Sequence, residues 1–184
     1  MSSIIKVNEI QDGGGNTILS SDGSGTVTQT RTGILMADQW RLTSTFTGNV
    51  DPISSNLERI DSSGQGTLGT GMTVSSGRFS FPSTGIYLVR FNHFMRFKDG
   101  NAQFRAGRIK LTTDNSSYST VASIAHGGND ESYSKSSAET LVDVTDTSNV
   151  KVSFATESMS TNDETVGNST ENQTTFTFIR LGDT

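Results

Sequence analysis

The sequence predicts an all-β protein, built as an antiparallel jelly-roll sandwich that follows a short extended N-terminal β arm. Small hydroxyl side chains are abundant, with 27 Ser and 26 Thr among 184 residues, beside 19 Gly and only two Pro. Such a composition is typical of strands and turns. Short segments that alternate apolar and polar residues recur along the chain. After residue 35 no window shows a sustained 3.6-residue apolar period, so no amphipathic helix is expected there.

Residues 1–35 are predicted to form a separate arm. Short apolar fragments alternate there with glycine turns at residues 12–16 and 22–25. Such fragments cannot bury a core alone, since even a complete hairpin is marginal in water. We therefore expect the arm to order against sister chains or a larger assembly, the alternative being a frayed tail. The apolar residues that would dock are Ile4, Ile5, Val7, Ile10, Ile18 and Leu19.

Residues 36–184 are predicted to form the jelly-roll knob, because seven or eight short strands separated by turns are typical of a sandwich. Pro82 and Gly85 mark one turn, since Pro fixes φ and Gly permits a positive φ. The expected strands cover residues 39–43, 78–81, 86–97, 104–111, 121–125, 141–144, 150–154 and 175–181.

The segment 86–97 gives the strongest strand signal and also predicts a subunit contact. One alternate set of its residues is nearly all apolar and should face the core. The other set is polar in part, but apolar residues interrupt it, whereas a solvated face is normally polar. We expect a subunit interface on this second face, the alternative being an irregularity of core packing. Its residues are Ile86, Leu88 and Phe94.

Two long polar segments, residues 127–137 and 157–173, are candidates for displayed recognition loops. Loops longer than about 12–15 residues are usually functional or disordered, so mobile decoration is the alternative. The candidate contact residues are Asp130, Glu131, Tyr133, Lys135, Asp163 and Glu164.

Charge and composition exclude several classes of partner. The net charge of −5 disfavours a nucleic-acid partner, because phosphate binding needs a basic stripe. The chain has no Cys, which removes disulfides, thiol nucleophiles and zinc–cysteine sites. No apolar run is long enough for a membrane span, and residues 1–6 lack the pattern of a signal peptide.

No motif in the chain supports catalysis, a cofactor or a metal site. Residues 64–69 match Gly-x-Gly-x-x-Gly, but the helix that must follow a dinucleotide fingerprint is missing from the pattern. His93 lies on the apolar side of a strand and His126 precedes two glycines, which suits a turn. Asp143 and Asp146 do not form the dense oxygen cluster that calcium requires. We therefore expect a non-enzymatic protein without cofactor or metal.

Residues 77–91 read Gly-Arg-Phe-Ser-Phe-Pro-Ser-Thr-Gly-Ile-Tyr-Leu-Val-Arg-Phe. This segment resembles the Phe-x-Phe-Pro-x-x-Gly-x-Tyr signature of the complement globular-head and tumour-necrosis-factor jelly rolls. Residues 141–154 and 176–181 are similar to that family's paired and closing strands, although Thr-Ser-Asn at 147–149 replaces the usual Gly-Asp. The resemblance covers roughly residues 39–182. It implies a compact homotrimer held by an apolar central seam.

Residues 4–17 and 21–28 resemble the N-terminal arm of bacteriophage tail-fibre and head-decoration proteins. Together the two resemblances imply a non-enzymatic structural virion protein of a bacteriophage. Its arm would dock to other virion proteins, of tail or capsid, and its knob would face outward to bind a host-surface glycan or protein. The alternative is a soluble trimeric ligand-binding module of cytokine-like or lectin-like type, and a glycan-cleaving tailspike ranks last.

Overall fold

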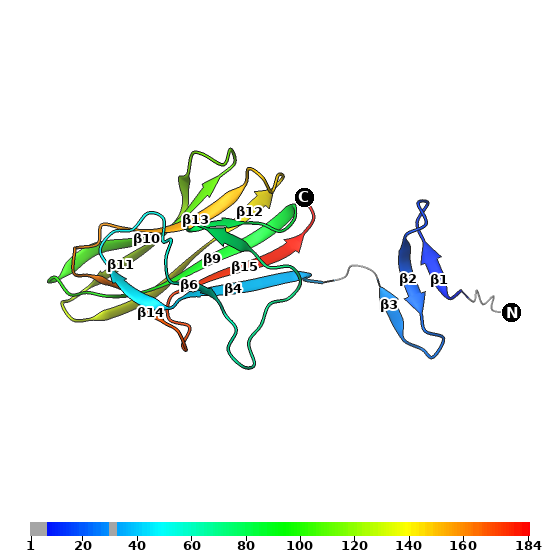
Figure 1. Cartoon of the computed structure of the whole chain (residues 1–184), viewed down its shortest axis with the longest axis horizontal. Helices are drawn as coiled ribbons and strands as arrows, with labels where there is room; N and C mark the ends of the chain where they lie inside the picture. Colours follow the sequence, from blue (N-terminus) through cyan, green and yellow to red (C-terminus); the bar gives the residue numbers. More distant parts are fainter. Residues whose placement is uncertain (1–6, 30–32) are drawn as a thin grey trace. The chain divides into compact units, whose positions relative to one another are not determined.

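The computed structural model describes residues 7–29 and 33–184, and every regular element in these ranges is a β-strand (Figure 1). The chain divides into two compact units, Met1–Leu35 and Met36–Thr184. Each unit has its own sheet structure and is described by itself.

The N-terminal unit is a small antiparallel meander in which the central strand pairs with both others. Its strands are β1 (Glu9–Gln11), β2 (Thr17–Ser21) and β3 (Val27–Gln29). The turn between β1 and β2 is closed by Asp12, whose Oδ1 accepts the backbone N–H of Gly14 at 2.8 Å and of Asn16 at 2.9 Å. Gly15 adopts φ of 81°, a left-handed conformation that glycine reaches without steric cost. The glycine turns expected from the sequence are confirmed.

The second unit, residues 36–184, is a sandwich of two antiparallel sheets. The first sheet has the strand order β7–β8–β13–β10–β11. Its strands are β7 (Thr73–Ser75), β8 (Arg78–Ser80), β13 (Lys151–Glu157), β10 (Ala102–Thr112) and β11 (Ser119–Gly128).

The second sheet of the sandwich is centred on the long strand β9 (Gly85–Arg96). Along one side β9 pairs with β15 and then β14, and along the other it pairs with β12 over its whole length. The remaining strands extend the sheet beyond β14 and β15. The strands besides β9 are β4 (Met36–Leu42), β5 (Ser44–Thr47), β6 (Leu57–Arg59), β12 (Tyr133–Val144), β14 (Glu164–Asn168) and β15 (Thr175–Gly182).

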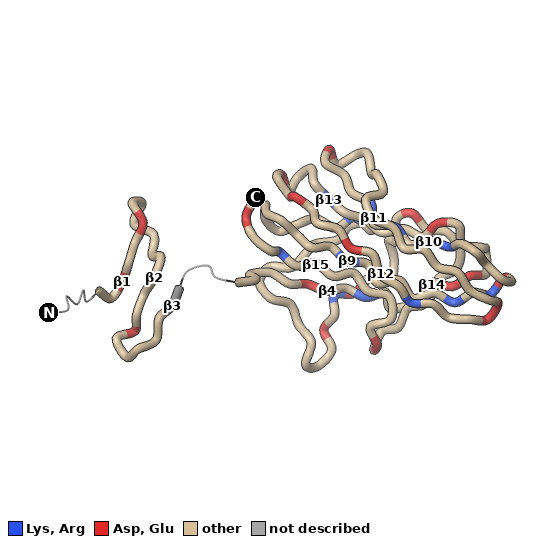
Figure 2. The backbone as a smooth tube through the Cα atoms, turned by 180° about the vertical axis from the view of Figure 1, so that it is seen from behind, with Lys and Arg blue, Asp and Glu red and all other residues tan. Residues whose placement is uncertain are grey.

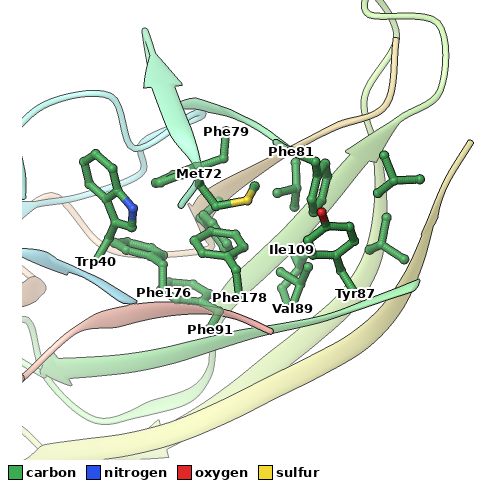
Figure 3. Packing of buried hydrophobic residues seen from close by; sticks show 14 of the residues in the cluster. Trp40, Met72, Phe79, Phe81, Tyr87, Val89, Phe91, Ile109, Phe176 and Phe178 are labelled. Carbon is green, nitrogen blue, oxygen red and sulfur yellow. The ribbon is translucent and has the colours of Figure 1, made fainter. Parts of the chain in front are cut away.

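The core between the sheets is dominated by aromatic rings, as Figure 3 shows. Phe91 of β9 lies opposite Phe176 of β15, and their rings stack with centroids 5.2 Å apart. Phe79 of β8 meets Phe178 across the sandwich at 5.1 Å. These contacts follow from the period of two, which sends alternate side chains of each strand to the same face. The expected all-β jelly roll is therefore confirmed.

Four short strands, β5, β6, β7 and β14, lie outside the predicted set, and both predicted loops are shorter than expected. Residues 127–137 are mostly strand, because β11 ends at Gly128 and β12 begins at Tyr133. Residues 157–173 contain β14. The sequence did not predict these strand residues of β12 and β14, because they are polar and do not alternate with apolar residues. Pairing with β9 holds both strands in the sheet.

Candidate subunit-contact and recognition surfaces

Aliphatic side chains line up across the outer face of the β9 sheet. Leu88 of β9 lies directly opposite Leu141 of β12 on one side and Ile179 of β15 on the other. Ile179 in turn faces Ala37 of β4, which is bridged to Leu68. Directly opposed residues of antiparallel strands share a face. We call this line of five residues, Leu68–Ala37–Ile179–Leu88–Leu141, the aliphatic row.

The aliphatic row is not covered within one chain. Leu141 is 63% exposed and Leu68 is 50% exposed. Ile86 is half-buried and stands two residues before Leu88 in β9, so both side chains lie on the same face. Single exposed hydrophobics are ordinary on a protein surface, whereas a contiguous exposed patch marks an interaction site.

A polar row borders the aliphatic row on the same face. Gln39 donates from Nε2 to the Thr177 hydroxyl at 2.8 Å, and Arg90 donates from Nε to Glu139 at 2.9 Å. Thr177 and Arg90 are register partners, so both pairs belong to one line across the sheet. A hydrogen-bonded polar edge beside an apolar strip is the usual anatomy of a protein interface.

The structure separates the predicted interface residue Phe94 from Ile86 and Leu88. Phe94 packs against Tyr133 with ring centroids 5.6 Å apart, and Lys135 Nζ lies 5.8 Å from the Phe94 ring. The Arg96 guanidinium lies over Tyr133 at 5.3 Å and donates a hydrogen bond to Glu131. Two predicted recognition residues, Tyr133 and Lys135, therefore lie against Phe94, and a third, Glu131, joins this group through Arg96. All three are exposed.

Asp163 is a structural residue, and its prediction as a displayed contact is wrong. Its side chain is fully buried. It accepts hydrogen bonds from Arg105 and from the backbone N–H groups of Lys98 and Ser160, both at 3.0 Å. Burial alone would raise the pKa of Asp163, but these donors hold that pKa below its ordinary value. Asp163 therefore fixes the start of β14 and faces no partner.

The other two predicted loop residues are engaged by their own chain. Glu164 lies 3.3 Å from Lys98 Nζ and 3.8 Å from an Arg96 nitrogen. Asp130 accepts the backbone N–H of Gly100 at 3.2 Å. Neither arrangement prevents an exposed oxygen from meeting a partner, so their recognition role stays a prediction.

In the N-terminal unit the predicted docking residues are largely exposed. Val7, Ile10 and Ile18 are exposed and Leu19 is half-buried. Ile10 and Leu19 are direct register partners and share one face of the small sheet. Ile4 and Ile5 lie outside the described residues.

The two histidines are buried and hydrogen-bonded to each other. The expected turn at His126 is wrong, because His126 lies within β11. His126 Nε2 is 3.1 Å from His93 Nδ1. The outer nitrogens meet hydroxyls, with His93 Nε2 3.0 Å from Thr165 and His126 Nδ1 2.9 Å from Ser134. Burial lowers the pKa of His93 to about 3 and that of His126 to about 4, and the neighbouring ring adds to the effect at His93. Both rings are neutral and unavailable to a substrate.

Among residues 7–29 and 33–184, no group of three or more His, Asp or Glu side chains could hold a metal ion. In the same ranges no helix is long and apolar enough to cross a membrane. Basic and acidic residues alternate over the strands and turns of the knob (Figure 2).

Sequence reasoning found Leu88 and missed the other members of the aliphatic row. Leu141 and Ile179 were assigned to strands, but only the register with β9 puts them beside Leu88. Leu68 stands in a Gly-rich loop with no periodic signal. The exposed alternate positions of the C-terminal strands were the one signal that could have pointed to this surface.

Two facing antiparallel sheets with this strand order define a jelly-roll sandwich of the tumour-necrosis-factor type. Murine APRIL at pH 5.0 is similar, with a TM-score of 0.58 and 10% identity over 79% of this chain and 98% of its own. Eiger TNF from S. frugiperda has a TM-score of 0.58 and 10% identity over 83% of this chain and 96% of its own. A second structure of murine APRIL, at pH 8.0, has a TM-score of 0.52 and 12% identity over 79% of this chain and 98% of its own. No protein-family model and no curated protein matches the sequence.

Proposed function

We propose that the protein is a non-enzymatic, homotrimeric ligand-binding module of cytokine-like or lectin-like type. The observation that carries this proposal is the aliphatic row, an exposed apolar line across the β9 sheet. The family that residues 77–91 resemble forms trimers through an apolar seam, and the row supplies such a seam here. The likeness of the fold to APRIL and Eiger TNF supports the same arrangement.

The energetics of the row favour association. Burying one Leu or Ile side chain contributes roughly 1.5–3 kcal/mol. Within a single chain Leu141 is 63% exposed and Leu68 is 50% exposed. At least half of this contribution is therefore gained only on assembly. Threefold repetition of a displayed surface then multiplies weak contacts with a multivalent ligand.

A virion role is the second candidate function, and the N-terminal unit favours it. This meander exposes Ile10, Ile18 and Val27 on three very short strands, and Val7 is exposed just before the first of them. Burying these exposed aliphatic side chains against another surface would stabilise such a small sheet. In this proposal the unit attaches the trimer to a bacteriophage tail or capsid, as the resemblance of residues 4–17 implies, and the protein resides in the virion.

The mass of the full-length protein in solution, measured by light scattering, tests the trimer. We expect a mass near three times the 19.7 kDa chain. Leu141→Glu should give a monomer, because a charge would have to be buried within the subunit contact. Val121→Glu is the matched control, since Val121 is an exposed residue of β11 in the other sheet.

A monomeric wild-type protein would overturn the proposal. So would a folded Leu141→Glu variant that keeps the trimeric mass, because the subunit contact would then lie elsewhere.

A further inference from the structure

The outer face of the first sheet carries a polar groove, on the side of the sandwich away from the aliphatic row. Arg78 of β8 lies opposite Ser153 of β13, which lies opposite Lys110 of β10. Two pockets of about 210 and 260 Å³ adjoin this line, and Arg78 lines both. We call them together the Arg78 groove. The smaller pocket is lined by Ser75, Ser76, Arg78, Ser80, Asn115 and Lys151.

The groove holds a surplus of positive charge. Lys110 pairs with Asp51, but Arg78 and Lys151 have no carboxylate partner among the described residues. No acidic residue lines the smaller pocket. Asp114 is in the turn beside it, where backbone N–H groups of Ser117 and Ser116 bind its carboxylate and lower its pKa. Its single charge offsets only one of the two free cations.

Tyr118 adds a polar atom that has no hydrogen-bond partner among residues 7–29 and 33–184. The residue lines the larger pocket, and its ring lies under the Arg78 guanidinium at 5.2 Å. Its hydroxyl is buried without a hydrogen bond in the described residues. A buried polar group without a hydrogen bond is unfavourable, and a ligand that pairs with it removes that cost. Burial raises the pKa of Tyr118, against the opposing effect of Arg78, so the hydroxyl remains a donor at neutral pH.

We propose that the Arg78 groove binds an anionic saccharide. Its sulfate or carboxylate group would lie between Arg78 and Lys151. The planar guanidinium of Arg and the ammonium of Lys are the strong protein donors to such anions. Sugar hydroxyls would meet the serine hydroxyls of the two pockets. A ligand that draws Arg78 off the Tyr118 ring would also give the Tyr118 hydroxyl its missing partner.

A saccharide fits this groove better than a nucleic acid does. Nucleic-acid binding needs many phosphate contacts, and single strands also need open aromatic faces for stacking. The groove offers two free cations, and the ring of Tyr118 is covered by Arg78. Hydroxyl groups dominate its remaining lining.

This inference rests on the proposed role as a binding module and names the ligand class. The groove belongs to the β8–β13–β10 sheet, whereas the proposed subunit contact belongs to the β9 sheet. Trimer formation through the aliphatic row would therefore leave three grooves open, and the two proposals can fail separately.

Titration calorimetry on the full-length protein at low salt tests the groove. The probes are a sulfated heparin-type oligosaccharide, a polyuronate oligosaccharide, neutral dextran and a single-stranded DNA of matched charge. We expect at least one anionic saccharide to bind and dextran not to bind. The Arg78→Gln/Lys151→Gln double variant should weaken binding by about tenfold or more, since it removes both charged donors to the anion.

Two further variants sharpen the test. Lys98→Gln is the control, because Lys98 follows β9 in the other sheet. This variant removes one positive charge, as does each of the two substitutions in the groove. It should leave saccharide affinity unchanged. Tyr118→Phe should weaken saccharide binding several-fold without lowering the thermal unfolding temperature, because the hydroxyl has no hydrogen bond to lose within the described part of the chain.

Absence of binding by both anionic saccharides would overturn the inference. Equal weakening by Lys98→Gln would also overturn it, by showing unspecific charge attraction, and tighter binding of the DNA would replace the saccharide by a nucleic acid. A trimeric mass in the same samples without saccharide binding refutes the groove alone. A monomer that binds the saccharide refutes only the trimer.

Discussion

At the scale of single residues, the buried histidine chain makes stability depend on pH. Each neutral ring has one N–H, and His93 and His126 both use one nitrogen as donor and the other as acceptor along the chain from Thr165 to Ser134. Protonating both rings would place two N–H groups face to face, and a proton added to one ring would put a charge in a buried site. Burial, rather than the hydrogen-bond geometry alone, therefore keeps both rings neutral.

We expect the free energy of unfolding to fall as the pH drops from about 6.5 to 5. The unfolded histidines have a pKa near 6.5, whereas the folded values are about 3 and 4. Because the unfolded state binds more protons in this window, acidification favours unfolding. Each histidine contributes about 2 kcal/mol between neutral pH and pH 5, at about 1.4 kcal/mol per pH unit.

Urea denaturation at fixed protein concentration and several pH values measures this dependence. His126→Gln keeps polar groups at the site but does not titrate, so its stability should change less steeply with pH than that of the wild type. A wild-type stability that stays flat from pH 7 to 5 would contradict the neutral, buried pair.

Asp38 is a second residue with a decisive role, because it ties the loop carrying Leu68 to β4. Its buried carboxylate accepts hydrogen bonds from Arg59 Nε at 3.0 Å, Trp40 Nε1 at 3.0 Å and the Met72 backbone N–H at 2.8 Å. Asp38→Ala should cost about 2–6 kcal/mol, because two buried donors, each costing about 1–3 kcal/mol when unpaired, lose their acceptor together with the partly exposed Arg59 guanidinium.

Chemical denaturation and hydrogen exchange check the Asp38→Ala prediction. Backbone amides near Leu68 and Met72 should lose protection. Asp61→Ala is the control, since the Asp61 side chain is 76% exposed and its contact with Arg41 is 3.4 Å long. A surface pair of this kind contributes about 0–1 kcal/mol. Equal losses for the two variants would show that Asp38 does not hold the loop.

At the scale of elements, Gly167 controls how β14 pairs with β5. A Cβ at this position would stand 2.6 Å from the Ser44 carbonyl carbon and oxygen, which are backbone atoms that cannot rotate away. Gly167→Ala should therefore push the two strands apart and destabilise the knob by about 1–3 kcal/mol. Thermal unfolding measures the loss, with Gly66→Ala as control, because nothing lies within 4 Å of a Cβ at Gly66.

A Gly167→Ala variant as stable as Gly66→Ala would mean that β5 separates from β14 without cost. In that case β5 would be a peripheral strand rather than a part of the sheet that supports His93 through Thr165.

Elements with a clean alternation were predictable from the sequence, and those defined by pairing partners were not. Phe79, Phe91 and Phe176 mark strands whose buried faces follow directly from the period of two. In contrast, β14 has no apolar run, and β12 is largely polar up to Leu141. Register is a property of two strands together, so the aliphatic row and the His93–His126 contact could not be read from one segment.

At the scale of the whole molecule, the N-terminal unit and the knob should be thermodynamically separable. The main buried cluster lies entirely within residues 36–184, whereas the exposed aliphatics Val7, Ile10, Ile18 and Val27 give the first unit little core of its own. Deleting residues 1–35 should therefore leave the unfolding temperature of the knob within a few degrees of the full-length value. It should also leave the trimeric mass unchanged, because the aliphatic row is retained.

In the virion proposal the same deletion abolishes attachment to the particle, which co-sedimentation of full-length and truncated protein with phage particles would measure. Retained co-sedimentation would place the docking surface on the knob instead. A truncated protein that becomes monomeric would have a different meaning, since the small sheet would then be part of the subunit contact. Its exposed apolar residues would in that case be covered by sister chains, and the need for a particle to cover them would disappear.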